Sequence, residues 1–105
     1  MSTYSRIKKE FIFLEKMYEF KITLKRKYGA YYFIKWTNVV KNIMVLYDEL
    51  VDDHLSIRVY DADALSFDAE EYKDEFDKKG KQQYVIQGAA EWLKKEIEDK
   101  RITAQ

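Results

Sequence analysis

The spacing of hydrophobic residues changes along this chain, and each change predicts a new element. Near the N-terminus, apolar residues recur every three or four positions, at Ile7, Phe11, Leu14 and Tyr18. This spacing places them on one side of a helix, so we predict an amphipathic helix over residues 4–18 that is capped by a nearby serine or threonine.

The middle of the chain alternates apolar and polar residues, which is typical of half-buried strands. We expect four strands, whose same-side residues are Phe20, Ile22 and Leu24 in the first; Tyr32, Ile34 and Trp36 in the second, over residues 31–37; Val39, Ile43, Val45 and Tyr47 in the third, over residues 39–47; and Leu55, Ile57 and Val59 in the fourth. The connections between them are short, so the strands should form an antiparallel meander.

Two helices are expected after the strands. Asp68 followed by Glu71 resembles a capping box, and residues 69–79 end just before Gly80, which predicts a short helix. An apolar stripe from Val85 to Ile97 predicts a longer helix over residues 82–101. The chain therefore reads as one α+β domain over residues 1–105, with a four-stranded antiparallel sheet, an N-terminal helix and two C-terminal helices.

Both sides of the expected sheet carry apolar residues. Tyr31, Phe33, Met44 and Leu46 fall on the side opposite to Ile34 and its neighbours. Two arrangements would cover this second side: the N-terminal and C-terminal helices take one side each, or a partner or a second copy in a homodimer covers it.

Composition indicates a folded chain in a reducing compartment. Among the 105 residues, 47% are hydrophobic and none is Cys, so neither a disulfide nor a cysteine-based metal site can form. The charged N-terminus does not resemble a signal peptide, and no apolar run has the length of a membrane span. We expect a soluble, cytoplasmic protein with no membrane association.

The charges balance overall but are unevenly distributed. The 19 basic and 19 acidic residues give a net charge of zero. Residues 1–41 hold 10 Lys or Arg and 3 Glu, whereas residues 42–79 hold 4 basic and 12 acidic residues. Such asymmetry indicates charged binding faces, unless the two blocks lie side by side in the fold.

Candidate chemistry is sparse. His54 follows an acidic turn, but no nucleophile motif or second histidine accompanies it, which favours a solvated turn residue. Asp61, Asp63 and Asp68 suggest a calcium loop, but the residue at the sixth position is Ser66 where that loop needs glycine. We therefore expect no metal, no cofactor and no small-molecule substrate, and an enzyme that uses carboxylates such as Asp61 and Asp63 with His54 is the least favoured function.

Two charged segments are candidate contact surfaces. The acidic candidate residues for protein binding, with two aromatic anchors among them, are Asp61, Asp63, Asp68, Glu70, Glu71, Tyr72, Asp74 and Phe76. The basic candidates for contacting phosphates are Lys21, Lys25, Arg26, Lys27 and Lys35. For the acidic segment, the ordinary alternative is a solvated helix whose two aromatics pack in the chain's own core.

The order of an aromatic strand (YYFIKWTN), a hairpin into an acidic turn, a further strand (SIRVYDAD) and an Ala-Ala-x-Trp-Leu-Lys helix resembles small uncharacterised bacterial proteins. Some of these are similar to the immunity proteins of polymorphic toxin systems. The resemblance implies a non-enzymatic protein that blocks a partner toxin, and it assigns no functional residue.

These observations favour a non-catalytic protein-binding module of bacterial or phage origin, with the acidic segment as its contact surface. A nucleic-acid-binding accessory protein that uses the basic segment is the alternative, although zero net charge weighs against it.

Overall fold

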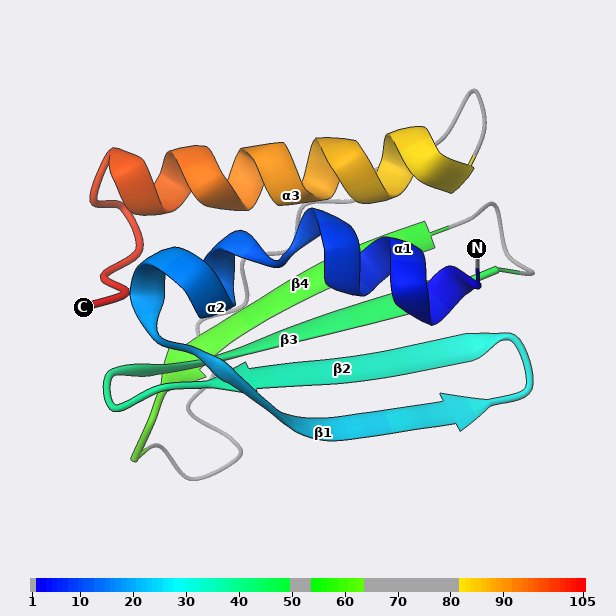
Figure 1. Cartoon of the computed structure of the whole chain (residues 1–105), viewed down its shortest axis with the longest axis horizontal. Helices are drawn as coiled ribbons and strands as arrows, with labels where there is room; N and C mark the ends of the chain where they lie inside the picture. Colours follow the sequence, from blue (N-terminus) through cyan, green and yellow to red (C-terminus); the bar gives the residue numbers. More distant parts are fainter. Residues whose placement is uncertain (1, 50–53, 64–81) are drawn as a thin grey trace.

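The computed structural model describes residues 2–49, 54–63 and 82–105. Its elements are α1 (Thr3–Glu10), α2 (Phe13–Tyr18), β1 (Lys21–Tyr28), β2 (Tyr31–Thr37), β3 (Lys41–Asp48), β4 (His54–Asp61) and α3 (Gln82–Glu98). The four strands form one antiparallel sheet in the order β1-β2-β3-β4, which confirms the α+β class and the meander (Figure 1). One C-terminal helix, α3, is present, and the helix expected over residues 69–79 lies outside the described residues.

The N-terminal helix is interrupted, whereas the sequence predicted one continuous helix over residues 4–18. Ser2 caps α1 by accepting a hydrogen bond from the Ser5 amide at 3.2 Å, and α1 ends at Glu10. Phe11 and Phe13 are both buried. Two residues apart, they would point to nearly opposite sides of a continuous helix with about 3.6 residues per turn. The break between α1 and α2 allows both rings to enter the core.

A β-bulge in β1 reverses the predicted sides of half that strand. Ile22 lies opposite Trp36, but Leu24 lies opposite Lys35, so the register shifts by one residue between them. One extra residue moves every later side chain to the other side of the sheet. The prediction that Leu24 shares a side with Ile22 is therefore wrong, and Lys25 takes that position instead.

The third strand starts two residues later than predicted because Asn38 closes a tight turn. Its side-chain oxygen accepts hydrogen bonds from the amides of Val40 and Lys41, both at 2.8 Å. Val39 therefore lies at the tip of the turn and is 95% exposed. The expectation that Val39 shares the buried side of the strand with Ile43 is wrong.

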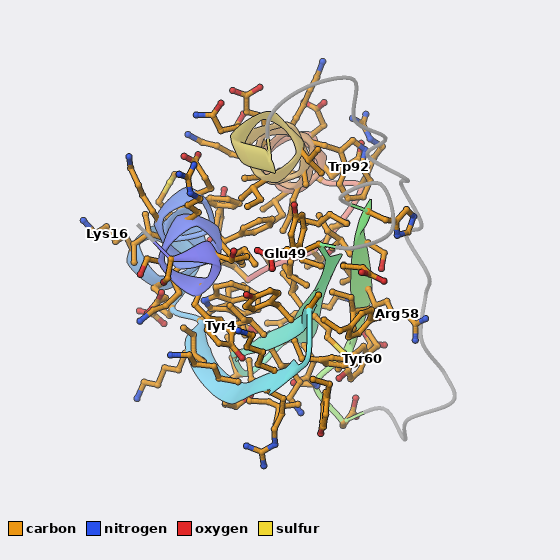
Figure 2. The ribbon with its side chains drawn as sticks, turned by 90° about the vertical axis from the view of Figure 1, so that its right-hand side faces the viewer. Tyr4, Lys16, Glu49, Arg58, Tyr60 and Trp92 are labelled. Carbon is orange, nitrogen blue, oxygen red and sulfur yellow. The ribbon has the colours of Figure 1, made fainter. Side chains whose placement is uncertain are left out.

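All described helices pack on one face of the sheet, which we call the inner face (Figures 1 and 2). Side chains from α1, α2 and α3 form a single core with alternate residues of the strands. The Phe11 ring stacks on the Trp36 ring, with centroids 5.6 Å apart. The N-terminal helices and α3 therefore share one side of the sheet instead of taking one side each, and none of the described helices covers the opposite, outer face.

The C-terminal helix ends earlier than expected because the chain turns at Lys100. Lys100 has φ of 59°, and the amides of Arg101 and Ile102 both donate to the Glu96 carbonyl oxygen, at 2.9 and 3.1 Å. This arrangement is typical of a helix C-terminus with a left-handed residue. It directs Ile102 and Ala104 into the core. No helix in the described ranges is long and apolar enough to cross a membrane.

Candidate binding surfaces

The outer face of the β1–β2 hairpin combines cations and aromatic rings. Strand pairing places Lys21 beside Thr37, Leu24 beside Lys35, and Arg26 beside Phe33 on this face, with Tyr28 beside Tyr31 at the hairpin end. We define the hairpin surface by its charged and aromatic members, which are Lys21, Arg26, Tyr28, Tyr31, Phe33 and Lys35.

Exposure differs across this face. Tyr28 is 65% exposed, and Lys21 and Arg26 are exposed as well. Tyr31, Phe33 and Lys35 are half-buried, and the Tyr31 and Phe33 rings contact each other with centroids 5.4 Å apart. On the neighbouring β3, Leu46 is only 3% exposed. The accessible part of the outer face therefore includes the hairpin, and on β4 it also includes Arg58.

The inner side of the same hairpin is tied to α1 by cations over tyrosine rings. The Lys25 ammonium lies 4.6 Å from the centroid of the Tyr4 ring, and the Lys27 ammonium lies 5.2 Å from that of Tyr32. The two rings meet edge to face at 5.0 Å. Burial raises the pKa of the Tyr4 phenol, although the positive charges of Lys27 and Arg26 oppose the rise. These cation–ring contacts link β1 to α1 and to β2, and both lysines remain exposed.

Glu49 joins α1 to the sheet and lies between them in Figure 2. Its carboxylate accepts hydrogen bonds from the Thr3 hydroxyl and, at 3.2 Å, from the Tyr32 hydroxyl. Its amide donates to the Ala30 carbonyl oxygen at 3.0 Å. Three distant segments meet at this one residue, so its carboxylate has a structural role.

The structure describes only two of the eight residues that the sequence predicts for the acidic surface. Asp61 ends β4 and forms an ion pair with the Lys41 ammonium, while Asp63 is exposed. The other six candidates, Asp68, Glu70, Glu71, Tyr72, Asp74 and Phe76, lie outside the described residues. The acidic contact surface therefore remains a prediction.

The predicted catalytic combination is not brought together. His54 begins β4 opposite Asp48, whereas Asp61 ends the same strand. Residues seven steps apart in a strand lie roughly 23 Å from each other, at about 3.3 Å per residue. Across the described ranges, no three His, Asp or Glu side chains gather closely enough to hold a metal ion.

Two shallow hollows flank the last residues of the chain. One of about 340 Å³ lies between Ile97, Lys100 and Ile102, and one of about 300 Å³ lies beside Asn38 and Val39. Tyr18 borders both hollows. The Asn38 amide group donates to the carbonyl oxygens of Tyr18 and Ala104, at 2.9 and 2.8 Å, which holds the chain end in place between them.

Sequence reasoning missed three residues that organise these surfaces. Asn38 closes the turn before β3, and it also joins α2 to the C-terminus. Glu49 was counted as one of many acidic charges. Thr23 is the extra residue of the bulge, and its hydroxyl lies 2.8 Å from that of Thr37. A β-branched residue in a strand gives no local signal of such a shift.

Comparison with known proteins does not add a relative: no protein family, no curated protein and no solved structure matches this chain.

Proposed function

We propose that this chain is a non-catalytic protein-binding module whose contact surface is the hairpin surface. One observation carries the proposal: α1, α2 and α3 all pack on the inner face, while the hairpin turns aromatic and basic side chains outward. A small domain can bury its outward aromatics under a helix of its own. The described helices do not do so here.

The residue types on this surface support the same function. Tyrosine, phenylalanine and arginine are enriched at protein interfaces, and tyrosine and arginine are frequent among the residues that dominate binding energy. Tyr28, 65% exposed, is the most accessible aromatic of the surface. Tyr31 and Phe33, half-buried and in contact, form a firm base beside it. We expect Tyr28 to be the anchor that a partner covers.

The resemblance to immunity proteins supports a partner of one kind, a toxin that the chain blocks. The absence of cysteine from the sequence supports a cytoplasmic location, where such an encounter would take place. Self-association through the same surface is the rival form of protein binding. It makes a distinct prediction, because a homodimer would form in the purified protein without any partner.

The test is capture from source-cell lysate with the tagged chain and a surface variant. Tyr28→Ser with Phe33→Ser should lose a nuclease-resistant, stoichiometric partner protein, because both anchors are removed. The matched control is Met17→Ser with Val39→Ser, which removes two exposed apolar side chains elsewhere (50% and 95% exposed). The control should retain the partner.

Three results would contradict the proposal. They are equal retention of the partner by both variants, loss of the partner with the control alone, and the absence of any protein that survives nuclease treatment. A homodimer of the purified chain that dissociates when Tyr28 and Phe33 are changed would replace the partner by a second copy.

A further inference from the structure

We infer that the segment of the partner that contacts the hairpin surface is acidic, an inference that rests on the proposed function. Lys21–Thr37 contains five cations, Lys21, Lys25, Arg26, Lys27 and Lys35, and no carboxylate. Within the described part of the chain, no carboxylate forms an ion pair with any of them. The ion pairs that the structure shows join other residues, such as Lys41 with Asp61 and Arg101 with Glu96.

Protection of the sheet edge accounts for only part of this charge. β1 is an edge strand, and lysines on an edge strand discourage pairing with other chains. Lys35, however, belongs to β2, which has a neighbour on each side. It is half-buried between Leu24 and Met44 in the same row of the sheet. A cation at an interior position, without a carboxylate beside it, has no role in edge protection.

The placement of the cations leaves them repelling one another. Arg26 lies two residues from Leu24, which is the direct partner of Lys35, so Arg26 and Lys35 are diagonal neighbours on the outer face. The Cα atoms of diagonal neighbours in an antiparallel pair are about 7 to 8 Å apart. Like charges on neighbouring side chains raise the energy of the free protein, and a carboxylate placed between them would lower it.

The same surface fits a nucleic acid less well. The bulge directs Lys25 and Lys27 to the inner side, over tyrosine rings, so the outer side keeps three of the five cations. Proteins that hold a nucleic-acid backbone commonly make about 6 to 10 phosphate contacts, and their domains are strongly basic. This chain has zero net charge. The Tyr31 and Phe33 rings also lie at 53° to each other, which is not a shared flat platform for stacked bases.

The experiment compares two anionic probes on the full chain. One is a random copolymer of glutamate and tyrosine, and the other is single-stranded oligodeoxythymidylate of similar total charge. Binding is followed by amide NMR spectra and by fluorescence anisotropy of labelled probes. We expect the copolymer to bind more tightly than the oligonucleotide, with the largest spectral changes in Lys21–Thr37. Raising NaCl from about 0.05 to 0.5 M should weaken binding about tenfold or more.

Charge reversal localises the binding. Lys21→Glu with Arg26→Glu and Lys35→Glu should weaken copolymer binding about tenfold or more. The matched control is Lys8→Glu with Lys9→Glu and Lys94→Glu, which changes the net charge equally at exposed positions of α1 and α3. The control should bind within about twofold of the unchanged chain. Amide spectra of both variants establish that each remains folded, and if the first does not, Lys35→Gln with Arg26→Gln replaces it.

Each other outcome overturns the inference. Tighter binding of the oligonucleotide would assign the surface to nucleic acid. If neither probe binds, the partner segment is not acidic. An equal loss of copolymer binding in both triple variants would mean that binding depends only on the net charge of the protein. If a partner from lysate still depends on Tyr28 and Phe33 but is insensitive to the charge reversal, the proposed function stands and only the acidic segment is wrong. If no partner depends on those aromatics, the proposed function itself fails.

Discussion

Alternate residues of the same strands lie on the two faces of the sheet, and the two faces differ in how deeply these residues are buried. On the inner face, Ile34 and Trp36 of β2 are fully buried under α1, α2 and α3. On the outer face, Phe33 and Lys35 of the same strand are half-buried, and the adjacent β1 exposes Arg26. The even positions of β2 are therefore part of the core, whereas its odd positions are only half-buried.

The faces also differ in what holds polar groups. Polar groups at the inner-face margins have firm partners, as Glu49 and Asn38 do. On the outer face of the hairpin, Lys21, Arg26 and Lys35 have no carboxylate partner among residues 2–49, 54–63 and 82–105. Glu49 and Asn38 already have partners within the fold, whereas the three outer-face cations can still pair with carboxylates of a ligand.

The largest expected difference between the faces is in stability. Trp36→Ala should lower the free energy of unfolding by about 3 to 5 kcal/mol, because it leaves a cavity beside Phe11 in the core. Phe33→Ala on the outer face should cost about 1 kcal/mol. Urea unfolding followed by circular dichroism measures both values. Equal losses would contradict the division between a structural inner face and the outer face that we propose for binding.

The next effect concerns the end of the molecule where Asn38 joins three segments. Asn38→Ala should cost about 1 to 3 kcal/mol, because the carbonyl oxygens of Tyr18 and Ala104 and two turn amides lose their partner. Val39→Ala, one residue further on, is the control and should change stability by less than about 0.5 kcal/mol. Unfolding in urea compares the two, and a harmless Asn38→Ala would show that the C-terminal contact is incidental.

A smaller effect is expected at Glu49. Glu49→Gln keeps the shape of the side chain but replaces charged hydrogen bonds from Thr3 and Tyr32 by weaker neutral ones, so the cost should be about 1 kcal/mol. Glu91→Gln on the exposed side of α3 is the control. Hydrogen exchange of the α1 amides should accelerate in the first variant only. Unchanged exchange would mean that α1 is held by its apolar contacts alone.

The smallest effect should appear at alkaline pH. Burial raises the pKa of Tyr4 and of Tyr60 above the ordinary value of 10.0. The folded protein then keeps these protons where the unfolded chain loses them, so their contribution to stability is complete below about pH 10 and falls as pH rises further. Urea unfolding at about pH 8 and about pH 11 measures the decline. It should be smaller in Tyr4→Phe and Tyr60→Phe, and an identical decline in these variants would contradict the assignment.

The sequence predicted the sheet well because its signal is local. Tyr31–Thr37 alternates without interruption, and its bounds and sides agree with β2. The helix break at Phe11 and the bulge at Thr23 were missed, because each is resolved by packing between distant segments. The hairpin surface depends on that bulge. A regular strand would have turned Lys25 and Lys27 outward and Arg26 inward. Composition therefore identified the basic residues of the candidate site but not which of them face outward.

Hydrogen–deuterium exchange of the chain with and without its captured partner tests directly whether the hairpin surface is the contact surface. The partner should slow exchange in Lys21–Thr37 and leave α3 and the residues around the C-terminal hollows unchanged. Slowed exchange near Asn38 and residues 97–105, with no change in the hairpin, would place the contact at the end of β2 opposite to the Tyr28–Tyr31 turn and would contradict the proposed contact surface.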